Sequence, residues 1–251
     1  MDALTGRYGR DVASAMGTVF GPRLIGVYLH GSAVLGGFDP RRSDIDILAV
    51  CEGPIRVAEQ SAVADRLSER QLPCPAQGLE LSIVTPAVAQ HPTAQPAFEF
   101  HMTTAPEDGK VVDGHGLDGD PDLVLHFAVC RSAGRVLGSG PAAAEVFAPV
   151  SRDLVVAQLE LELRWAVEHA DGEYTVLNAC RAWRFAVDDA LVSKVDGGRW
   201  ALDRVAGPDR ELIQTALDRQ RGALASELDP DAVRRFIRQS LSHLTGALPK
   251  Q

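Results

Sequence analysis

The chain has 251 residues, of which 45% are hydrophobic and 24% are charged, as in ordinary folded globular proteins. This composition excludes disordered, collagen-like and disulfide-scaffold proteins, and the length permits one large domain or two small ones. The net charge of −9 argues against a general nucleic-acid binder, which usually presents a basic surface to phosphates. An acidic surface would attract a cationic partner, or would serve solubility alone.

The sequence contains no recognisable targeting or membrane segment. No apolar run approaches the roughly 20 residues that span a bilayer, and residues 1–17 are interrupted by charges and lack an apolar signal core. We therefore expect a cytoplasmic protein. Its cysteines are widely spaced and form no C-x-x-C pair, so we expect reduced thiols rather than a metal site at Cys51, Cys74, Cys130 and Cys180.

The first part of the chain predicts a mixture of strands and helices. Apolar spacing predicts helices over 7–20 and 54–71, and strands over 24–29, 45–50 and 79–84. Ser32 can cap a short helix after the first strand. Residues 85–120 give only a weak signal, because several Pro, Gly and Asp residues interrupt them.

From about residue 121 the pattern becomes helical. One helix is expected from Pro121 to Arg131, and another begins at Pro141. Start signals and apolar spacing predict four more helices, over 151–169, 174–193, 208–226 and 230–246. The fold class is therefore α+β, with a mixed sheet and helices at 1–150 and an all-helical part at 151–251.

Two aspartates begin the second predicted strand. Alternate side chains of a strand share a face, so Asp44 and Asp46 point the same way while Ile45 faces the core. Carboxylates so close repel each other unless a cation lies between them, and Mg²⁺ is the simplest such cation. Glu80 would join the aspartates if its strand is a neighbour of theirs.

A second feature lies at the turn after the first strand. Gly31 permits close approach of a phosphate, and the backbone N–H groups of a helix start suit an anion. The hydroxyl of Ser32 adds another donor. A phosphate cradle beside a paired-carboxylate metal site is what nucleotidyl transfer requires.

The order of these features resembles the nucleotidyltransferase β superfamily. The chain is also similar to the aminoglycoside 3″-nucleotidyltransferases, the streptomycin/spectinomycin adenylyltransferases, in HGSAVLGGFDPRRSDIDILAV at 30–50, LELSIV at 79–84, VLGSGPAAAEVFAPV at 136–150 and VLNACRAWRFAVDDALVSK at 176–194. The resemblance implies a polymerase β-like nucleotidyltransferase domain at 1–150. It further implies a helical substrate- and nucleotide-binding domain at 151–251, with the active site in the cleft.

The resemblance implies a role for each matched residue. Asp44 and Asp46 would bind Mg²⁺, and Glu80 would be the general base on the acceptor hydroxyl. The nucleotide would be bound by Gly31, Ser32, Arg181 and Lys194. Asp171 would meet the cationic groups of the antibiotic. By their position alone, Glu168 and Glu173 flank Asp171 and would deepen a negative pocket, and Trp165, one helix turn before Glu168, would line the cleft.

Simpler roles remain open for several of these residues. Arg181 and Lys194 also suit a solvated or salt-bridged helix surface, and Asp171 could cap the following helix. We expect His30, where the family usually has Tyr, to be a packing residue or to support the residues that bind the ligand from behind. His101 and His115 lack metal-ligand partners and are expected at the surface.

One departure from the family bears on the acceptor. Streptomycin-modifying members have a Trp after the phenylalanine of the segment that matches 98–103, and this chain has none. The lost ring platform favours spectinomycin or another cation over streptomycin. Asp171 and its neighbours also lie in a hinge loop that is shorter than in the family.

The resulting prediction is a monomeric, Mg²⁺-dependent enzyme that transfers AMP from ATP to a hydroxyl of a cationic antibiotic and so confers resistance. Neither nucleic acid nor membrane is an expected partner. The alternative is a nucleotidyltransferase that acts on another small metabolite, or on a partner protein as antitoxin-type modules do. Such modules are usually shorter and lack the helical part. A nucleotide-binding relic is disfavoured because the carboxylates and the serine are all present.

Overall fold

The computed structural model describes residues 3–170, 172–223 and 226–246. The chain divides into two compact units, Met1–Val150 and Ser151–Gln251. Within the described ranges, no helix is long and apolar enough to cross a membrane. The four cysteines are free thiols, and three of them are buried.

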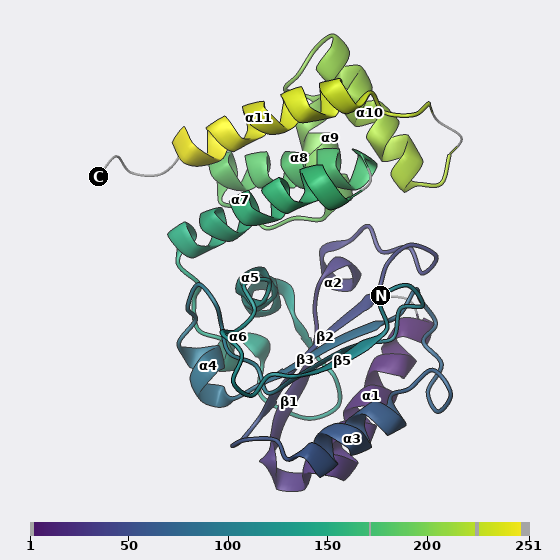
Figure 1. Ribbon diagram of the computed structural model, residues 1–251, viewed down its shortest axis with the longest axis vertical. Helices are drawn as coiled ribbons and strands as arrows, with labels where there is room; N and C mark the ends of the chain where they lie inside the picture. Colours follow the sequence, from purple (N-terminus) through teal and green to yellow (C-terminus); the bar gives the residue numbers. More distant parts are fainter. Residues whose placement is uncertain (1–2, 171, 224–225, 247–251) are drawn as a thin grey trace. The chain divides into compact units, whose positions relative to one another are not determined.

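The N-terminal unit is built on one six-stranded sheet in the order β5-β4-β3-β2-β1-β6 (Figure 1). Its elements in chain order are α1 Ala3–Phe20, the 3-10 helix η1 Gly21–Arg23, β1 Leu24–Leu29, α2 Ser32–Leu35, β2 Ile45–Cys51, α3 Val57–Arg66, β3 Leu79–Val84, α4 Pro86–Gln90, β4 Phe100–Thr103, β5 Lys110–Asp113, α5 Leu123–Ala133, β6 Arg135–Val136 and α6 Ala143–Val146. β2 and β3 are parallel, whereas the other pairs are antiparallel. The sheet is therefore mixed, as α+β predicts.

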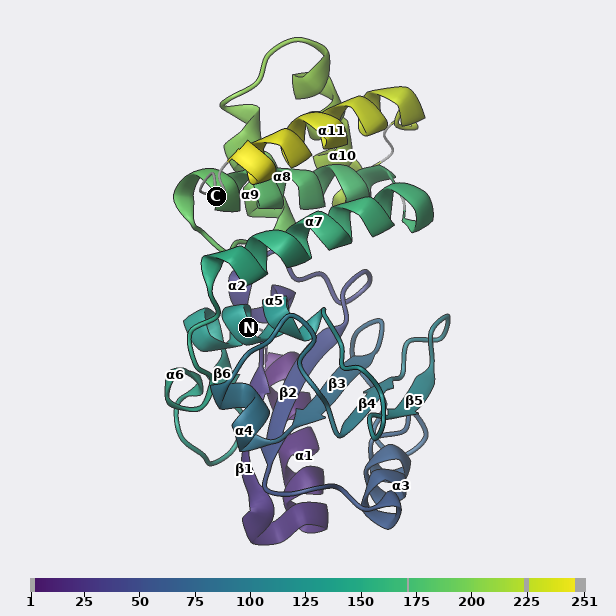
Figure 2. The ribbon, with the colours of Figure 1, turned by 60° about the vertical axis from the view of Figure 1, so that its left-hand side comes forward.

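Helices cover both faces of this sheet, and the alternation of each strand decides which side chain goes where (Figure 2). On one face, α1 and α3 pack against Leu29, Ile47 and Leu81. On the other face, α4, α5 and α6 pack against Tyr28, Leu48 and other side chains of even number. Any polar residue at an even position of β2 or β3 therefore lies on the face that α5 covers.

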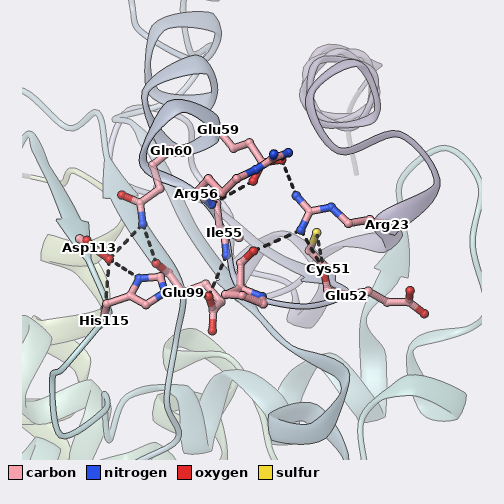
Figure 3. A network of polar contacts seen from close by, with 11 residues as sticks. Arg23, Cys51, Glu52, Ile55, Arg56, Glu59, Gln60, Glu99, Asp113 and His115 are labelled. Atoms are coloured by element: carbon pink, nitrogen blue, oxygen red, sulfur yellow. Dashed lines mark hydrogen bonds and ion pairs between the residues drawn. The ribbon is translucent and has the colours of Figure 1, made fainter.

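A network of polar contacts joins η1, the loop between β2 and α3, α3, Glu99 and β5 in the N-terminal unit (Figure 3). Arg23 donates to the carbonyls of Glu52 and Pro54 and pairs with Glu59. The carboxylate of Glu99 accepts a hydrogen bond from the backbone of Ile55, at 3.0 Å. These bonds pair backbone carbonyl and N–H groups of the loop between β2 and α3. They thereby fix the start of the crossover from β2 to β3.

The same network continues to β5 through three polar side chains. Gln60 donates to the carboxylate of Asp113 at 3.0 Å and to the backbone of Glu99 at 3.3 Å. The ring of His115 lies 2.7 Å from Asp113 and 3.5 Å from Glu99 (Figure 3). The segment after the edge strand is therefore tied to α3 and β4 by side chains rather than by an apolar core.

The C-terminal unit is entirely helical in its described residues. It consists of α7 Arg152–His169, α8 Gly172–Asp188, α9 Lys194–Leu202, α10 Pro208–Gln220 and α11 Pro230–Gly246. α8 is central and packs against all four of the others. The buried side chains of α8 include Val176, Leu177 and Phe185.

One sequence prediction about the helices was wrong. The single helix expected over 174–193 is broken, because α8 ends at Asp188 and Asp189 has a φ of 53°. Ser193 then caps a separate helix, α9. Its hydroxyl oxygen accepts a hydrogen bond from the backbone N–H of Asp196 at 3.1 Å. The weak segment 85–120 contains α4, β4 and β5, whose strands are only four residues long.

Candidate active site

Asp46 and Glu80 are neighbours across two parallel strands. Asp46 pairs in register with Glu80, and both residues hold even positions, on the face of the sheet that α5 covers. Both side chains lie at the starts of their strands, where the sheet meets the turn after β1. Asp44 lies just before β2. The structure thus brings together the three carboxylates that the sequence singled out.

The turn after β1 touches Asp46 directly. The backbone N–H of His30 donates to the carbonyl of Asp46 at 3.0 Å, and the backbone of Ser32 donates to its carboxylate. Gly31 lies between them with a φ of 62°, a left-handed conformation that favours glycine. Gly31 also caps α2, which has only four residues. The Gly-Ser turn and the acidic pair therefore form one continuous site.

The surroundings of Asp46 oppose its ionisation. Burial and the negative charge of Glu80 raise the pKa of Asp46 to about 7, and Asp44 adds to this effect. His126 and the Ser32 backbone act in the opposite direction. In the free protein, the surroundings of Asp46 thus do not fully stabilise a negative charge on both Asp46 and Glu80.

Glu80 has His126 and Thr103 as neighbours, with His101 nearby on β4. Nε2 of His126, on α5, lies 4.0 Å from Oε1 of Glu80. The ring of His126 in turn lies 4.9 Å from the ring of His30, between centroids. Thr103 is the partner of Glu80 on β4, and His101 lies beyond it.

His30 is buried next to Asp46, as the sequence predicted, whereas His101 differs from its prediction. His30 is buried beside the site, and burial followed by the nearby His126 lowers its pKa well below the ordinary value. His101 is half-buried, and its Nδ1 lies 3.0 Å from the hydroxyl of Ser82. Burial lowers the pKa of His101 as well, so the expectation of a simple surface histidine was wrong.

His126 is the residue that sequence reasoning missed. The spacing of α5 contained a signal for it, because Leu123, Phe127 and Cys130 are the sheet-facing residues of that helix. A side chain three residues after Leu123 and four before Cys130 lies on the same side of the helix. A polar residue on that face was a candidate for the site.

In the C-terminal unit, Arg181 and Lys194 lie in one polar cluster. Arg181 donates two hydrogen bonds to the carboxylate of Glu162, at 2.8 and 2.9 Å. The hydroxyl of Tyr174 donates to the same carboxylate at 3.3 Å, and Nζ of Lys194 lies 4.0 Å from the centre of the Tyr174 ring. Burial, followed by the charge of Glu162, raises the pKa of Tyr174 to about 12.

A pair of glycines in α9 makes this cluster possible. A Cβ atom on Gly197 would lie 2.8 Å from the backbone nitrogen of Arg181. A Cβ on Gly198 would lie 2.8 Å from the side chain of Leu177 and 2.9 Å from that of Leu217. Because both glycines lack a side chain, α9 packs closely against α8. This contact sets the start of α9, and so Lys194, beside Tyr174.

The residues expected to meet the acceptor are not gathered in this cluster. Trp165 is 53% exposed on α7 and stacks on His169, with ring centroids 5.3 Å apart. Glu168 is exposed on the same helix. Asp171 lies outside the described residues. Glu173, expected to deepen the negative pocket, is buried and paired with Arg219 of α10 at 3.0 Å.

Comparisons with known proteins agree with this architecture. Residues 145–243 match the family described as the C-terminal domain of aminoglycoside adenylyltransferase. An aminoglycoside (3'') (9) adenylyltransferase of Escherichia coli is 28% identical over 223 residues, which is 83% of each chain. A protein of the same name from Klebsiella pneumoniae is also 28% identical, over 222 residues and 83% of each chain.

A solved structure extends the likeness to nearly the whole chain. It is a spectinomycin adenyltransferase, AAD(9), from Enterococcus faecialis, crystallised with ATP and spectinomycin. Its TM-score is 0.75 and its identity 16%, over 95% of this chain and 98% of that one. At this level of identity, the similarity shows that the two chains share a fold.

Proposed function

Because this chain belongs to the aminoglycoside 3″-nucleotidyltransferase family, we propose that it transfers AMP from ATP to a hydroxyl group of a cationic aminoglycoside or aminocyclitol. The observation that carries the proposal is the register pair of Asp46 and Glu80 beside the Gly31 turn. Two carboxylates side by side, next to backbone donors, suit the transfer of a nucleotidyl group. The proposed product is an adenylylated antibiotic, and the proposed consequence is resistance.

The carboxylates fit a magnesium site that is completed by substrate. Within the described ranges, no group of three or more His, Cys, Asp or Glu side chains could hold a metal by itself. Mg²⁺ is usually bound by one or two carboxylates together with phosphate oxygens and water, rather than by an all-protein cage. The raised pKa of Asp46 indicates a place where added positive charge would be favourable. We propose that Asp44 and Asp46 hold Mg²⁺, which would offset the negative charge of the triphosphate when bound.

The chain's own groups then have distinct tasks. The backbone of the Gly31 turn and the hydroxyl of Ser32 hold the phosphates in place. Glu80 accepts the proton of the acceptor hydroxyl as its oxygen forms a bond to the α-phosphorus. The bond between the α-phosphorus and the oxygen that bridges to the β-phosphate breaks, and pyrophosphate leaves with that electron pair.

The helical unit is proposed to supply the remaining contacts. Arg181 and Lys194 would bind the nucleotide phosphates, and Glu162, which accepts two hydrogen bonds from Arg181, keeps its guanidinium oriented. Trp165, Glu168 and Asp171 would meet the cationic acceptor. We propose spectinomycin rather than streptomycin as the acceptor, because Trp is missing from the segment 98–103. We further propose that the chain acts as a monomer in the cytoplasm.

The test is a pyrophosphate-release assay of the purified chain with ATP and Mg²⁺ against spectinomycin, streptomycin and other aminoglycosides. Mass spectrometry of the acceptor should show the addition of AMP. Glu80→Gln should lower kcat by about 10²- to 10⁴-fold, the usual contribution of a general base. The matched control is Glu107→Gln, which changes an exposed carboxylate of the same unit.

Three results would contradict parts of the proposal. Wild-type turnover by Glu80→Gln would remove Glu80 from the role of base. AMP transfer to streptomycin but not to spectinomycin would reverse the proposed preference. No transfer to any antibiotic would favour the alternative, a nucleotidyltransferase for another metabolite or for a partner protein.

A further inference from the structure

His126 projects from α5 toward the sheet. Leu123, Phe127 and Cys130 of the same helix are fully buried against the even-numbered side chains of the strands. His126 shares their side of the helix, but it lies over the polar end of the sheet rather than over its apolar middle. α5 thus holds the imidazole over the same face that carries Asp46 and Glu80.

Two contacts define the place of the imidazole. Its Nε2 lies 4.0 Å from Oε1 of Glu80, and the two side chains are 25% and 33% exposed. On its other side, the ring meets His30 at 4.9 Å between centroids, with the planes tilted by 45°. His30 is 2% exposed and is fixed to Asp46 through its backbone. His126 is therefore braced by a rigid neighbour on one side and faces Glu80 on the other.

We propose that His126 is a positioning residue for Glu80, an inference that rests on the proposed AMP transfer. Glu80 lies beside Asp46, so the repulsion between the two carboxylates disfavours a single fixed orientation of the Glu80 side chain. An N–H group of His126, whose Nε2 lies 4.0 Å from Oε1 of Glu80, counters this repulsion and restricts the Glu80 carboxylate to one orientation. His126 acts through Glu80 and exchanges no proton with the acceptor.

The alternatives make different use of the same geometry. A purely structural role would depend on the volume of the ring against His30, and not on its nitrogen. A role as the general base would make Glu80 dispensable. The positioning role needs both the nitrogen atom of His126 and the carboxylate of Glu80. Loss of the His126 nitrogen should therefore lower kcat only while the Glu80 carboxylate is present.

The experiment compares His126→Phe, which keeps the ring volume, with His126→Gln, whose side-chain amide can place an N–H near the position of Nε2. We expect His126→Phe to lower kcat by about 10- to 100-fold, the scale of a misplaced catalytic group, with KM for ATP changed by less than about twofold. His126→Gln should recover most of that loss. His91→Phe, at an exposed histidine of the same unit, is the control and should match the wild type.

The double variant separates positioning from packing. If His126 acts through Glu80, the loss in Glu80→Gln/His126→Phe should be no larger than the loss in Glu80→Gln alone. Equal losses in His126→Phe and His126→Gln, or losses that multiply in the double variant, would overturn the positioning role. A wild-type chain that transfers AMP, together with an unimpaired His126→Phe, would overturn the inference and leave the proposed function standing.

A measurement on the free protein tests the contact without catalysis. In ¹⁵N NMR spectra of the imidazoles, Glu80→Gln should shift the Nε2 resonance of His126, whereas Glu107→Gln should not. An unshifted resonance would overturn the positioning role even if the chain proves to be active. A chain with no AMP transfer would instead overturn the proposed function, and the mechanistic inference with it.

Discussion

A Cβ atom built on Gly31 would lie 1.7 Å from Oδ2 of Asp46, far inside any possible contact distance. The turn after β1 and the carboxylate of β2 therefore occupy adjoining space, and only the absence of a side chain allows this. Gly31 also has a φ of 62°, which L side chains rarely adopt. The residue is thus required twice, by its backbone conformation and by the approach of Asp46.

Gly31→Ala should abolish AMP transfer, because the new methyl group must displace Asp46 or the turn. Gly53→Ala is a matched control, since Gly53 has a φ of 70° and nothing within 4 Å of its ideal Cβ position. Both variants carry the strain of a left-handed alanine, roughly 1–2 kcal/mol. We expect Gly31→Ala to lose at least as much thermal stability as Gly53→Ala, and turnover only in Gly53→Ala. Turnover by Gly31→Ala within tenfold of the wild type would show that Asp46 need not stay where it lies.

Asp46→Asn should make the free protein more stable at neutral pH while it removes activity. The pKa of Asp46 is raised to about 7, so the folded state favours the protonated acid. Ionisation costs stability as the pH rises from the unfolded pKa, near 4, to the folded one near 7. Asparagine does not ionise, so the Asp46→Asn variant does not lose this folding stability as the pH rises.

Thermal unfolding of the metal-free and ligand-free protein checks this prediction. The Tm of Asp46→Asn should exceed that of the wild type by several degrees at pH 8, and the difference should shrink at pH 4.5. Asp108→Asn, an exposed carboxylate paired with Lys110, is the control. A Tm advantage that stays constant with pH would mean that ionisation of Asp46 is not its cause.

Gly197→Ala should weaken the helical unit and raise KM for ATP. The added methyl group would meet the backbone of Arg181, which cannot move aside as a flexible side chain can. Separation of α9 from α8 would then carry Lys194 away from Tyr174. Overpacking of this kind costs about 1–3 kcal/mol. Gly246→Ala, near the end of α11 and with nothing within 4 Å, should leave Tm and KM unchanged.

His115→Ala should lower stability more at pH 5.5 than at pH 8.5. A side-chain hydrogen bond to Asp113 raises the pKa of His115, so the protonated ring stabilises the folded state. That contribution is complete below the unfolded pKa of about 6.5 and is lost as the pH rises through the folded value. His91→Ala, at an exposed histidine, controls for the substitution itself. A larger loss of Tm at pH 8.5 than at pH 5.5 would contradict the assignment.

The central strands and their acidic pair could be predicted from sequence because their signals are local. β1, β2 and β3 are short apolar runs with clear alternation, so the face on which Asp46 and Glu80 lie follows from their even positions. The sequence alone did not establish that β2 and β3 are adjacent, and the meeting of Asp46 and Glu80 depended on that condition. The register of Asp46 with Glu80 confirms it.

Other features could not be predicted because they depend on tertiary contacts. β4 and β5 have four residues each and are held by pairing with β3 and by the network around Glu99, which no local pattern reveals. The break between α8 and α9 occurs in AVDDALVSK at 186–194, which contains neither Gly nor Pro, and depends on the left-handed Asp189. The contact of His126 with Glu80 joins residues from α5 and β3, elements that lie far apart in the chain.

The two outer strands of the sheet have a further consequence for the behaviour of the chain at high concentration. An exposed strand edge offers unpaired backbone groups on which a strand of another molecule can add. β6 consists of Arg135 and Val136 only, and β5 begins with Lys110, whose charge is paired with Asp108. Edges so short and so charged are poor templates, and they protect the unit from amyloid-like aggregation.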